Sequence, residues 1–286
     1  MSTFMPGLAN EVVLPPADFE RVRRLIKERA GIHLQPSKQS MVQGRLARLL
    51  REHGLSSYSA LLDAVDRPQS PLWQSFVNAL TTNLTSFFRE AYHFPLLAEY
   101  IRAQRGPVRI WCAASSTGEE PWSIAMTALE TLGPSAQVSI FASDIDTDVL
   151  STARAGVYPV DGDKGLEPAR LRRWFLKGTG PNAGMMRVRP ELSRIVEFGQ
   201  INLVNDPLRF QHPFDVVFCR NVMIYFDPPT QRTVLTRLHA ALRPGGLLFV
   251  GHSENFSSQS DLFSLRGKTV YERLAERSSR EPECIR

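Results

Sequence analysis

Residues 113–121 (AASSTGEEP) have types and spacing that suit a ligand-binding turn. Small residues let the backbone approach a ligand, and a helix is expected to begin at about Pro121, a favoured first-turn residue. The acidic residues Glu119 and Glu120 at this helix N-terminus disfavour phosphate and suit a cationic or ammonium-bearing ligand. The turn matches neither the GxGxxG fingerprint nor the P-loop. A tight turn with a capping Glu is an equally weighted alternative.

Two aspartates, Asp144 and Asp146, lie about 25 residues further on, after a run of apolar residues. Nucleotide-binding folds place a carboxylate at this position to hold ribose hydroxyls. A carboxylate can accept a hydrogen bond from each of two adjacent hydroxyls, so Asp144 is the candidate for that role. The competing interpretation is that one aspartate caps a helix at residues 147–155, and Asp146 is the better candidate for the cap.

Two later polar positions also follow apolar stretches. Asn202 offers a donor and an acceptor, which suits an adenine edge, and Leu203 could pack on a ring face. Asn221 follows residues 214–220 and is expected to face the reacting end of a ligand. Tyr225 combines an apolar body with a polar tip, although a lone tyrosine of this kind is more often core.

Residues 81–90 (TTNLTSFFRE) interleave polar and aromatic side chains. Asn83, Thr85 and Arg89 alternate with apolar residues. The stretch is either a capped helix start packed on a sheet or a lid that contributes Arg89 to a ligand carboxylate.

The elements that must position these residues are buried strands alternating with helices. Residues 108–114, 138–144, 214–220 and 247–252 are short, apolar and rich in Val, Ile and Phe, and helix-like stretches separate them. This pattern predicts a parallel α/β sheet covered on both faces. Such a sheet binds ligands beyond the carboxyl ends of its strands, where the candidate residues lie. A glycine-rich turn within residues 172–199 predicts an inserted antiparallel hairpin.

The first 80 residues have helical periodicity, with Ser37 as the expected N-cap of a basic helix at about 38–53. Residues 20–51 carry nine Lys/Arg against two Glu, a local excess of seven positive charges. The apolar and basic faces of the basic helix are separated, which fits either a solvated surface or a polyanionic partner. The basic face consists of Lys38, Arg45, Arg48 and Arg51.

Length and composition set the broad class. The chain has 286 residues, 43% hydrophobic and 22% charged, which predicts about two globular domains. No apolar run approaches the ~20 residues that a membrane span needs, and no signal peptide is evident. The three cysteines have no CxxC spacing, so neither a disulfide framework nor a metal site is expected, and a reduced cytoplasmic compartment is the default.

Five motifs in this order resemble those of the CheR family, chemotaxis receptor methyltransferases that use S-adenosylmethionine (SAM). They are TTNLTSFFRE, WCAASSTGEEP, SDIDTDVL, FCRNVMIYFD and FVGHSENF. The resemblance runs from about residue 16 to 274, and no motif position departs from the family pattern. It implies an α/β, Rossmann-like class I methyltransferase domain with a small antiparallel β-subdomain, preceded by an all-helical domain. The expected segments are a helical domain at 1–82, a linker helix at 83–106, a methyltransferase domain at 107–275 with its insertion at about 172–199, and a tail at 276–286.

The resemblance also implies roles for individual residues. Glu119 matches the acidic residue that holds the methionine amino group, with the neighbouring Glu120 as the less favoured alternative. Asp144 matches the ribose-binding position. Arg89 and Tyr225 match the positions of the reaction centre. The implied cofactor-binding set is Asn83, Thr85, Arg89, Ala113, Glu119, Asp144, Asn202, Leu203, Arg220 and Asn221.

The implied activity is methylation of glutamate side chains on cytoplasmic receptor helices, giving γ-methyl esters. Lys38, Arg45, Arg48 and Arg51 would then face the acidic receptor helices, and the insertion would capture a receptor C-terminal peptide. A cytoplasmic monomer that does not bind nucleic acid and does not insert into the membrane is expected. The alternatives are a nucleic-acid methyltransferase, suggested by the pI of about 9.3, and a cofactor-binding sensor without turnover.

Overall fold

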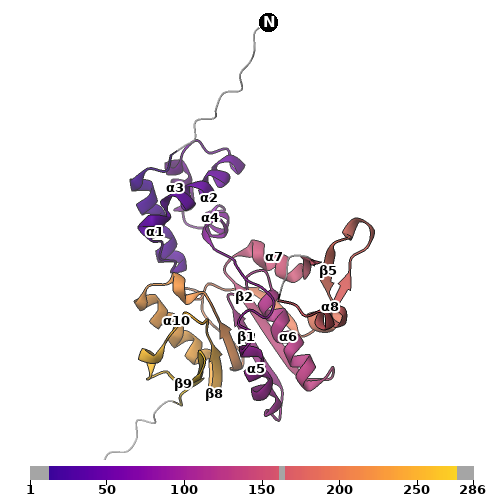
Figure 1. Ribbon diagram of the computed structural model, residues 1–286. Coiled ribbons are helices and arrows are strands. Elements are labelled where there is room, and N and C mark those ends of the chain that lie inside the picture. Colours follow the sequence, from indigo (N-terminus) through magenta and orange to yellow (C-terminus); the bar gives the residue numbers. More distant parts are fainter. Residues whose placement is uncertain (1–12, 161–164, 276–286) are drawn as a thin grey trace, which may run out of the picture. The chain divides into compact units, whose positions relative to one another are not determined.

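The computed structural model describes residues 13–160 and 165–275, and the chain divides into two compact units, Met1–Thr82 and Asn83–Arg286. Both units are drawn in Figure 1. The expected tail at 276–286 and the first twelve residues of the expected helical domain lie outside the described residues.

The first unit is helical, and its helices bury their apolar faces against one another. Val22, Leu46 and Leu61, from three different helices, are fully buried. The first helix ends at Gly31, whose φ of 74° suits glycine. The predicted N-cap at Ser37 is wrong, because Ser37 lies inside a 3-10 turn and the basic helix starts at Gln39 without a side-chain cap. The elements are α1 (Pro16–Ala30), η1 (Pro36–Lys38), α2 (Gln39–Glu52), α3 (Tyr58–Val65) and α4 (Trp73–Leu80).

The second unit is built on a seven-stranded, mostly parallel sheet. Its strand order within the described residues is β6-β2-β1-β7-β8-β10-β9. The parallel α/β prediction is confirmed, with β10 as the antiparallel exception, paired with both β8 and β9. The strands are β1 (Val108–Ala113), β2 (Val138–Asp144), β6 (Val196–Gln200), β7 (Phe214–Cys219), β8 (Leu242–Phe249), β9 (Phe263–Gly267) and β10 (Val270–Arg273).

The order in which the chain adds strands to the sheet reverses between β1 and β7, although the two strands are parallel. From β1 the chain proceeds outward through β2 to β6, and it then returns to start again at β7 on the other side of β1. Ligands of open α/β sheets bind beyond the strand carboxyl ends at such a switch point. The candidate residues after β1, β2 and β7 therefore converge at one edge.

Helices pack on this sheet, and α6 is buried along most of its length. The expected linker helix at 83–106 is wrong for its first ten residues, which form turns and irregular backbone. The helices are α5 (His93–Arg102), α6 (Glu119–Leu132), α7 (Thr147–Ala155), α8 (Pro168–Trp174), α9 (Pro190–Ser193) and α10 (Pro228–Ala241), with 3-10 turns η3 (Gly180–Asn182), η4 (Met223–Tyr225) and η5 (Ser257–Gln259).

A separate small antiparallel sheet confirms the predicted insertion but moves its bounds. Its order is β3-β5-β4, with β3 (Val157–Pro159), β4 (Phe175–Lys177) and β5 (Met185–Val188) (Figure 1). The first strand precedes the expected range of 172–199. The range also wrongly included most of β6, which pairs in parallel with β2 in the large sheet. Strand composition does not reveal which sheet a strand joins.

Candidate active site

Left-handed backbone at non-glycine residues is concentrated around the switch point. Such conformations cost about 1–3 kcal/mol each and persist where surrounding contacts fix them, often at functional sites. A glycine in the turn after β1 is left-handed too: Gly118 has φ of 100°, and a Cβ added there would lie 2.8 Å from Tyr158 Oη. The left-handed non-glycine residues in this region are Phe88, Glu90, Ala114, Ser116 and Asn221.

The two acidic residues at the start of α6 have different partners. Glu120 pairs with Arg220 at 2.5 Å and also accepts a hydrogen bond from the thiol of Cys112 at 3.3 Å. Glu119 accepts a hydrogen bond from the Thr117 hydroxyl at 2.6 Å, within the turn itself. Glu120 is therefore committed to the interior, which favours Glu119 as the ligand-binding carboxylate.

Asp144 ends β2 and holds the turn after β1. Its two oxygens accept backbone N–H groups from Ser116 at 2.8 Å and Asp146 at 3.0 Å. The residue is 7% exposed, and burial raises its pKa to about 6 although these hydrogen bonds act in the opposite direction. Each carboxylate oxygen has two lone pairs, so both can accept a further ligand hydroxyl.

Asp146 caps α7, as the sequence indicated. Its Oδ1 accepts the N–H groups of Asp148 at 2.9 Å and Val149 at 3.2 Å. Its Oδ2 accepts a hydrogen bond from Asn83 Nδ2 at 2.8 Å, and the Asn83 carbonyl accepts one from the Ser116 hydroxyl at 3.1 Å. Asn83 thus ties the segment before α5 to two strand-end turns.

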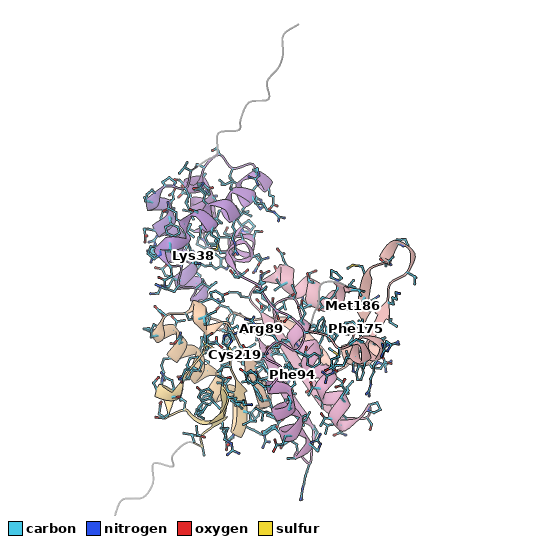
Figure 2. The ribbon with its side chains drawn as sticks, viewed as in Figure 1. Lys38, Arg89, Phe94, Phe175, Met186 and Cys219 are labelled. Carbon is cyan, nitrogen blue, oxygen red and sulfur yellow. The ribbon has the colours of Figure 1, made fainter. Side chains whose placement is uncertain are left out.

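The segment at 83–92 lies against α6 and carries Arg89. The Phe88 N–H donates to the Ser123 hydroxyl on α6 at 3.0 Å. One guanidinium nitrogen of Arg89, which is labelled in Figure 2, donates to the Leu84 carbonyl at 2.8 Å, so the side chain is bonded to its own loop. Thr85, half-buried, lies in the same loop.

Arg220 lies within this network rather than at an open edge. Its side chain is 1% exposed and pairs with Glu120 and, at 3.3 Å, with Glu90. It also donates to the backbone carbonyl of Arg89 at 2.6 Å. Arg220 therefore connects the end of β7 to the Arg89 loop and to α6.

Two buried carboxylates that the sequence analysis missed complete the network. Glu90 accepts from Asn221 Nδ2 at 3.3 Å and lies 3.0 Å from His252 Nδ1. Burial would raise the pKa of Glu90, but His252 and Arg220 outweigh it and lower the pKa to about 2. Glu254 accepts the backbone N–H groups of Asn221, Met223 and Gly251, and burial raises its pKa. Glu90 lies in the motif TTNLTSFFRE and Glu254 in FVGHSENF, so membership of these motifs is the sequence feature that could have pointed to them.

The remaining candidates follow β6 and β7. Asn202 Oδ1 accepts the N–H groups of Val204 at 3.0 Å and Asn205 at 3.3 Å, so its oxygen shapes a turn. Leu203 is 7% exposed. Tyr225 is half-buried in η4. The sheet order brings the ends of β6 and β7 to the same edge as the turn after β1.

The residues at this edge fit a ligand with ammonium, carboxylate and ribose groups. Glu119 and Asp144 supply acceptors, and Arg89 has five N–H donors, one of which donates to the Leu84 carbonyl. The Ser115 hydroxyl in the turn is buried and has no hydrogen-bond partner among the described residues. Ala113, which ends β1 and precedes this turn, is fully buried.

In the helical unit, the four predicted basic residues separate into two kinds. Lys38, Arg48 and Arg51 are exposed, and Arg48 pairs with Glu52 at 2.6 Å. Arg45 instead donates to the Leu80 and Thr81 carbonyls at 3.1 and 2.6 Å, at the end of α4. The expectation that Arg45 stands on the exposed basic face is therefore wrong, because the packing of α2 on α4 makes it half-buried and brings it to the carbonyls at the end of α4.

Within residues 13–160 and 165–275, no helix combines the length and apolar character needed to cross a bilayer, and no group of three or more His, Cys, Asp or Glu could hold a metal ion.

Comparison with known proteins gives two family matches and several long relatives. The CheR methyltransferase all-alpha domain matches residues 17–81, and the CheR methyltransferase SAM-binding domain matches residues 83–272. The chain is 51% identical over 266 residues to the chemotaxis protein methyltransferase of Salmonella typhimurium, covering 92% of each. It is also 51% identical to that of Escherichia coli, covering 92% of this chain and 93% of that one. Chemotaxis protein methyltransferase 2 of Pseudomonas aeruginosa is 52% identical over 258 residues, covering 89% and 92%. Since both domains match and relatives about half identical cover nearly the whole length, the chain belongs to the CheR family of SAM-dependent methyltransferases that act in chemotaxis.

Proposed function

We propose that this enzyme methylates glutamate side chains on cytoplasmic helices of chemotaxis receptors, forming γ-methyl esters, and that it acts as a monomer in the cytoplasm. The observation that carries the proposal is the charge of the strand-end edge in a chain of this family: Glu119 and Asp144 for the cationic and hydroxyl groups of SAM, and Arg89 for its carboxylate. SAM supplies a methyl group bound to a positively charged sulfur.

A glutamate carboxylate needs no general base from the protein. Its pKa is about 4.3, so it is already a nucleophilic anion at neutral pH. Its attack joins an anion to a sulfonium and cancels both charges, which a water-poor site favours. Alignment of the carboxylate oxygen with the methyl group supplies most of the remaining acceleration.

The proposed roles are those that the family resemblance implies, and the contacts of Arg220 and Asn221 support them. Arg89 binds the cofactor carboxylate, because a cation placed at the sulfonium would be repelled. Tyr225 orients the incoming glutamate through its hydroxyl. Arg220 and Asn221 position the Arg89 loop and the end of β7. The proposed cofactor contacts are Asn83, Thr85, Arg89, Ala113, Glu119, Asp144, Asn202, Leu203 and Asn221, whereas Arg220, with its side chain 1% exposed, acts through the Arg89 loop.

The direct test of the chemistry is transfer of a tritiated methyl group from SAM to receptor-containing membranes. Release of the label by mild base indicates an ester, whereas base-stable label contradicts glutamate methylation. Calorimetry of S-adenosylhomocysteine binding to the same enzyme preparation tests the proposed cofactor site.

Glu119→Gln removes a charge-assisted contact to the cofactor ammonium. A hydrogen bond to a charged group contributes about 1.5–3 kcal/mol, so we expect roughly 10- to 100-fold weaker binding. Glu99→Gln, an exposed change on α5, is the matched control and leaves the affinity unchanged. Unchanged affinity in both Glu119→Gln and Asp144→Ala contradicts the proposed site.

The exposed cations of α2 are proposed to steer acidic receptor helices to the enzyme. Exposed pairs contribute only about 0–1 kcal/mol each, so their effect falls on encounter and register. Lys38→Glu with Arg51→Glu lowers the rate of receptor methylation and spares cofactor binding. The matched double reversal Arg67→Glu with Arg105→Glu uses exposed cations outside the basic stretch. Equal rates in the two double variants contradict the role of α2.

The small sheet is proposed to bind a receptor C-terminal peptide as an added strand. In the described residues β3 and β4 are its outer strands, and Leu176 on β4 is 42% exposed. An edge strand can accept a peptide through backbone hydrogen bonds. Calorimetry with receptor tail peptides tests this, and no heat at high peptide concentration removes the proposal.

A further inference from the structure

Tyr158, on β3 of the small sheet, makes direct contact with the turn that follows β1. Its side chain is buried, and its hydroxyl donates to the Thr117 carbonyl at 2.8 Å. The same oxygen accepts a hydrogen bond from the indole N–H of Trp122 at 2.9 Å. Burial raises the pKa of Tyr158, so the hydroxyl stays protonated and keeps its donor role. Two hydrogen bonds from different directions fix the oxygen against the turn.

The ring of Tyr158 packs against the loop that carries Arg89, which is the second segment of the proposed cofactor site. It packs edge-on against Phe87, with ring centroids 5.2 Å apart and planes at 80°. Phe87 packs in the same way against Phe175 of β4, which is labelled in Figure 2, with centroids 5.4 Å apart. Phe87 stands two residues before Arg89, so the small sheet and the Arg89 loop share one aromatic cluster.

A neighbouring contact strengthens this connection. The guanidinium of Arg170, on α8, lies 4.0 Å from the centroid of the Phe88 ring. Glu130 of α6 holds that guanidinium at 2.9 Å and also accepts the indole N–H of Trp174 at 2.8 Å. Phe87 and Phe88 therefore both pack against residues of the small sheet and of α8.

The backbone of the turn lies so close to Tyr158 that only a glycine fits at position 118. An added Cβ at Gly118 would lie 2.8 Å from Tyr158 Oη and 2.9 Å from the Ala153 Cα. Gly118 immediately precedes Glu119, the proposed ammonium ligand. A displacement of the Tyr158 hydroxyl would therefore be transmitted to Glu119 through one residue.

We infer that Tyr158 is a positioning residue for the cofactor site, through which the small sheet fixes both the Thr117–Gly118 turn and the Arg89 loop. The inference rests on the proposed cofactor site. Tyr158 acts through Glu119 and Arg89 and makes no cofactor contact of its own. A change in the small sheet is thereby felt as a change in cofactor affinity.

The test compares Tyr158→Phe with Tyr271→Phe by calorimetry with S-adenosylhomocysteine. Tyr158→Phe keeps the ring and removes the hydroxyl, and we expect the dissociation constant to rise about tenfold, or about 1.4 kcal/mol. Tyr271, on β10, is the matched control, because its buried hydroxyl accepts the Phe256 N–H at 2.9 Å away from both cofactor segments. Its loss lowers the melting temperature without changing cofactor affinity.

Steady-state kinetics separates positioning from a purely structural role. In Tyr158→Phe the KM for SAM rises while kcat at saturating SAM stays within about twofold of wild type. Affinity within twofold of wild type in Tyr158→Phe, or an equal loss in Tyr271→Phe, overturns the inference. Glu119→Gln distinguishes the two levels: if it weakens binding and Tyr158→Phe does not, only the positioning inference fails, and if neither Glu119→Gln nor Asp144→Ala weakens binding, the proposed site fails.

Discussion

The strand-end edge of the α/β unit and helix α2 of the helical unit both concentrate charged residues, but they hold them in opposite ways. Arg220 has a side chain 1% exposed and pairs with two carboxylates, whereas Arg48 is 78% exposed and pairs with one. Removing one member of a buried pair leaves a charge without water or partner. An exposed charge is solvated whether or not its partner is present. The edge is therefore a rigid frame, and α2 carries charges that remain available to a partner.

The strongest way to break this comparison is Arg220→Met, which leaves Glu90 and Glu120 buried without their cation. Breaking a buried ion pair costs about 3–5 kcal/mol, and we expect a loss of this size in urea unfolding. Arg232→Met is the control, since Arg232 and Asp261 are 41% and 59% exposed. Its cost is expected to be small, because both charges are solvated with or without the partner. Similar losses in the two variants would show that burial does not set the energetics.

The pH dependence of unfolding tests the buried frame through a second residue, His93, which lies beside Arg220 and Glu90. His93 is fully buried, and burial, followed by the nearby Arg220, lowers its pKa from 6.5 to about 4, while Glu90 at 3.8 Å and the Lys268 carbonyl act to raise it. A base with a lowered folded pKa contributes stability above pH 6.5 that is lost as the pH falls toward 4. The full loss is about 3 kcal/mol.

The measurement is the difference in unfolding free energy between wild type and His93→Phe from pH 7 to pH 5. The difference is needed because the raised pKa of Asp144, about 6, acts in the opposite sense, adding stability as the pH falls. We expect wild type to lose about 2 kcal/mol more than the variant over this interval. Parallel curves would contradict the buried, neutral state of His93.

The smallest effects concern α2, where two arginines three residues apart are expected to differ. Arg45→Ala removes the donor from the carbonyls at the end of α4 and costs about 1–2 kcal/mol. Arg48→Ala removes one exposed i,i+4 pair and costs about 0.3–0.5 kcal/mol. Thermal or urea unfolding of the two variants gives the comparison, and an equal cost would place Arg45 among the solvated charges.

Local signals predicted much of what surrounds the site. Asp146 as the cap of α7 depends only on neighbouring N–H groups, so one stretch of sequence contains the whole interaction. Apolar runs likewise placed β1, β2 and β7 to within one residue at each end. The linker helix and the Ser37 cap were wrong because aromatic packing and a 3-10 turn overrode the local preference there.

Long-range partners could not be predicted in the same way. The sequence shows Arg45 and Arg48 as equivalent positions on one basic stripe, and only the packing of α4 distinguishes them. Glu90 meets Asn221, and Glu254 meets Asn221 and Met223, across more than 30 residues of chain, so neither motif alone indicates a buried network.

By itself, the sequence determined which residue types stand at the ends of the parallel strands, because strand and turn composition are local properties and the sheet then aligns its carboxyl ends. The tertiary structure decided which charges became a buried frame and which stayed in solvent. It also decided that Tyr158, from the small sheet, meets the turn of the large one. Those outcomes depend on burial and on contacts between distant segments, which fix the local dielectric and the available partners.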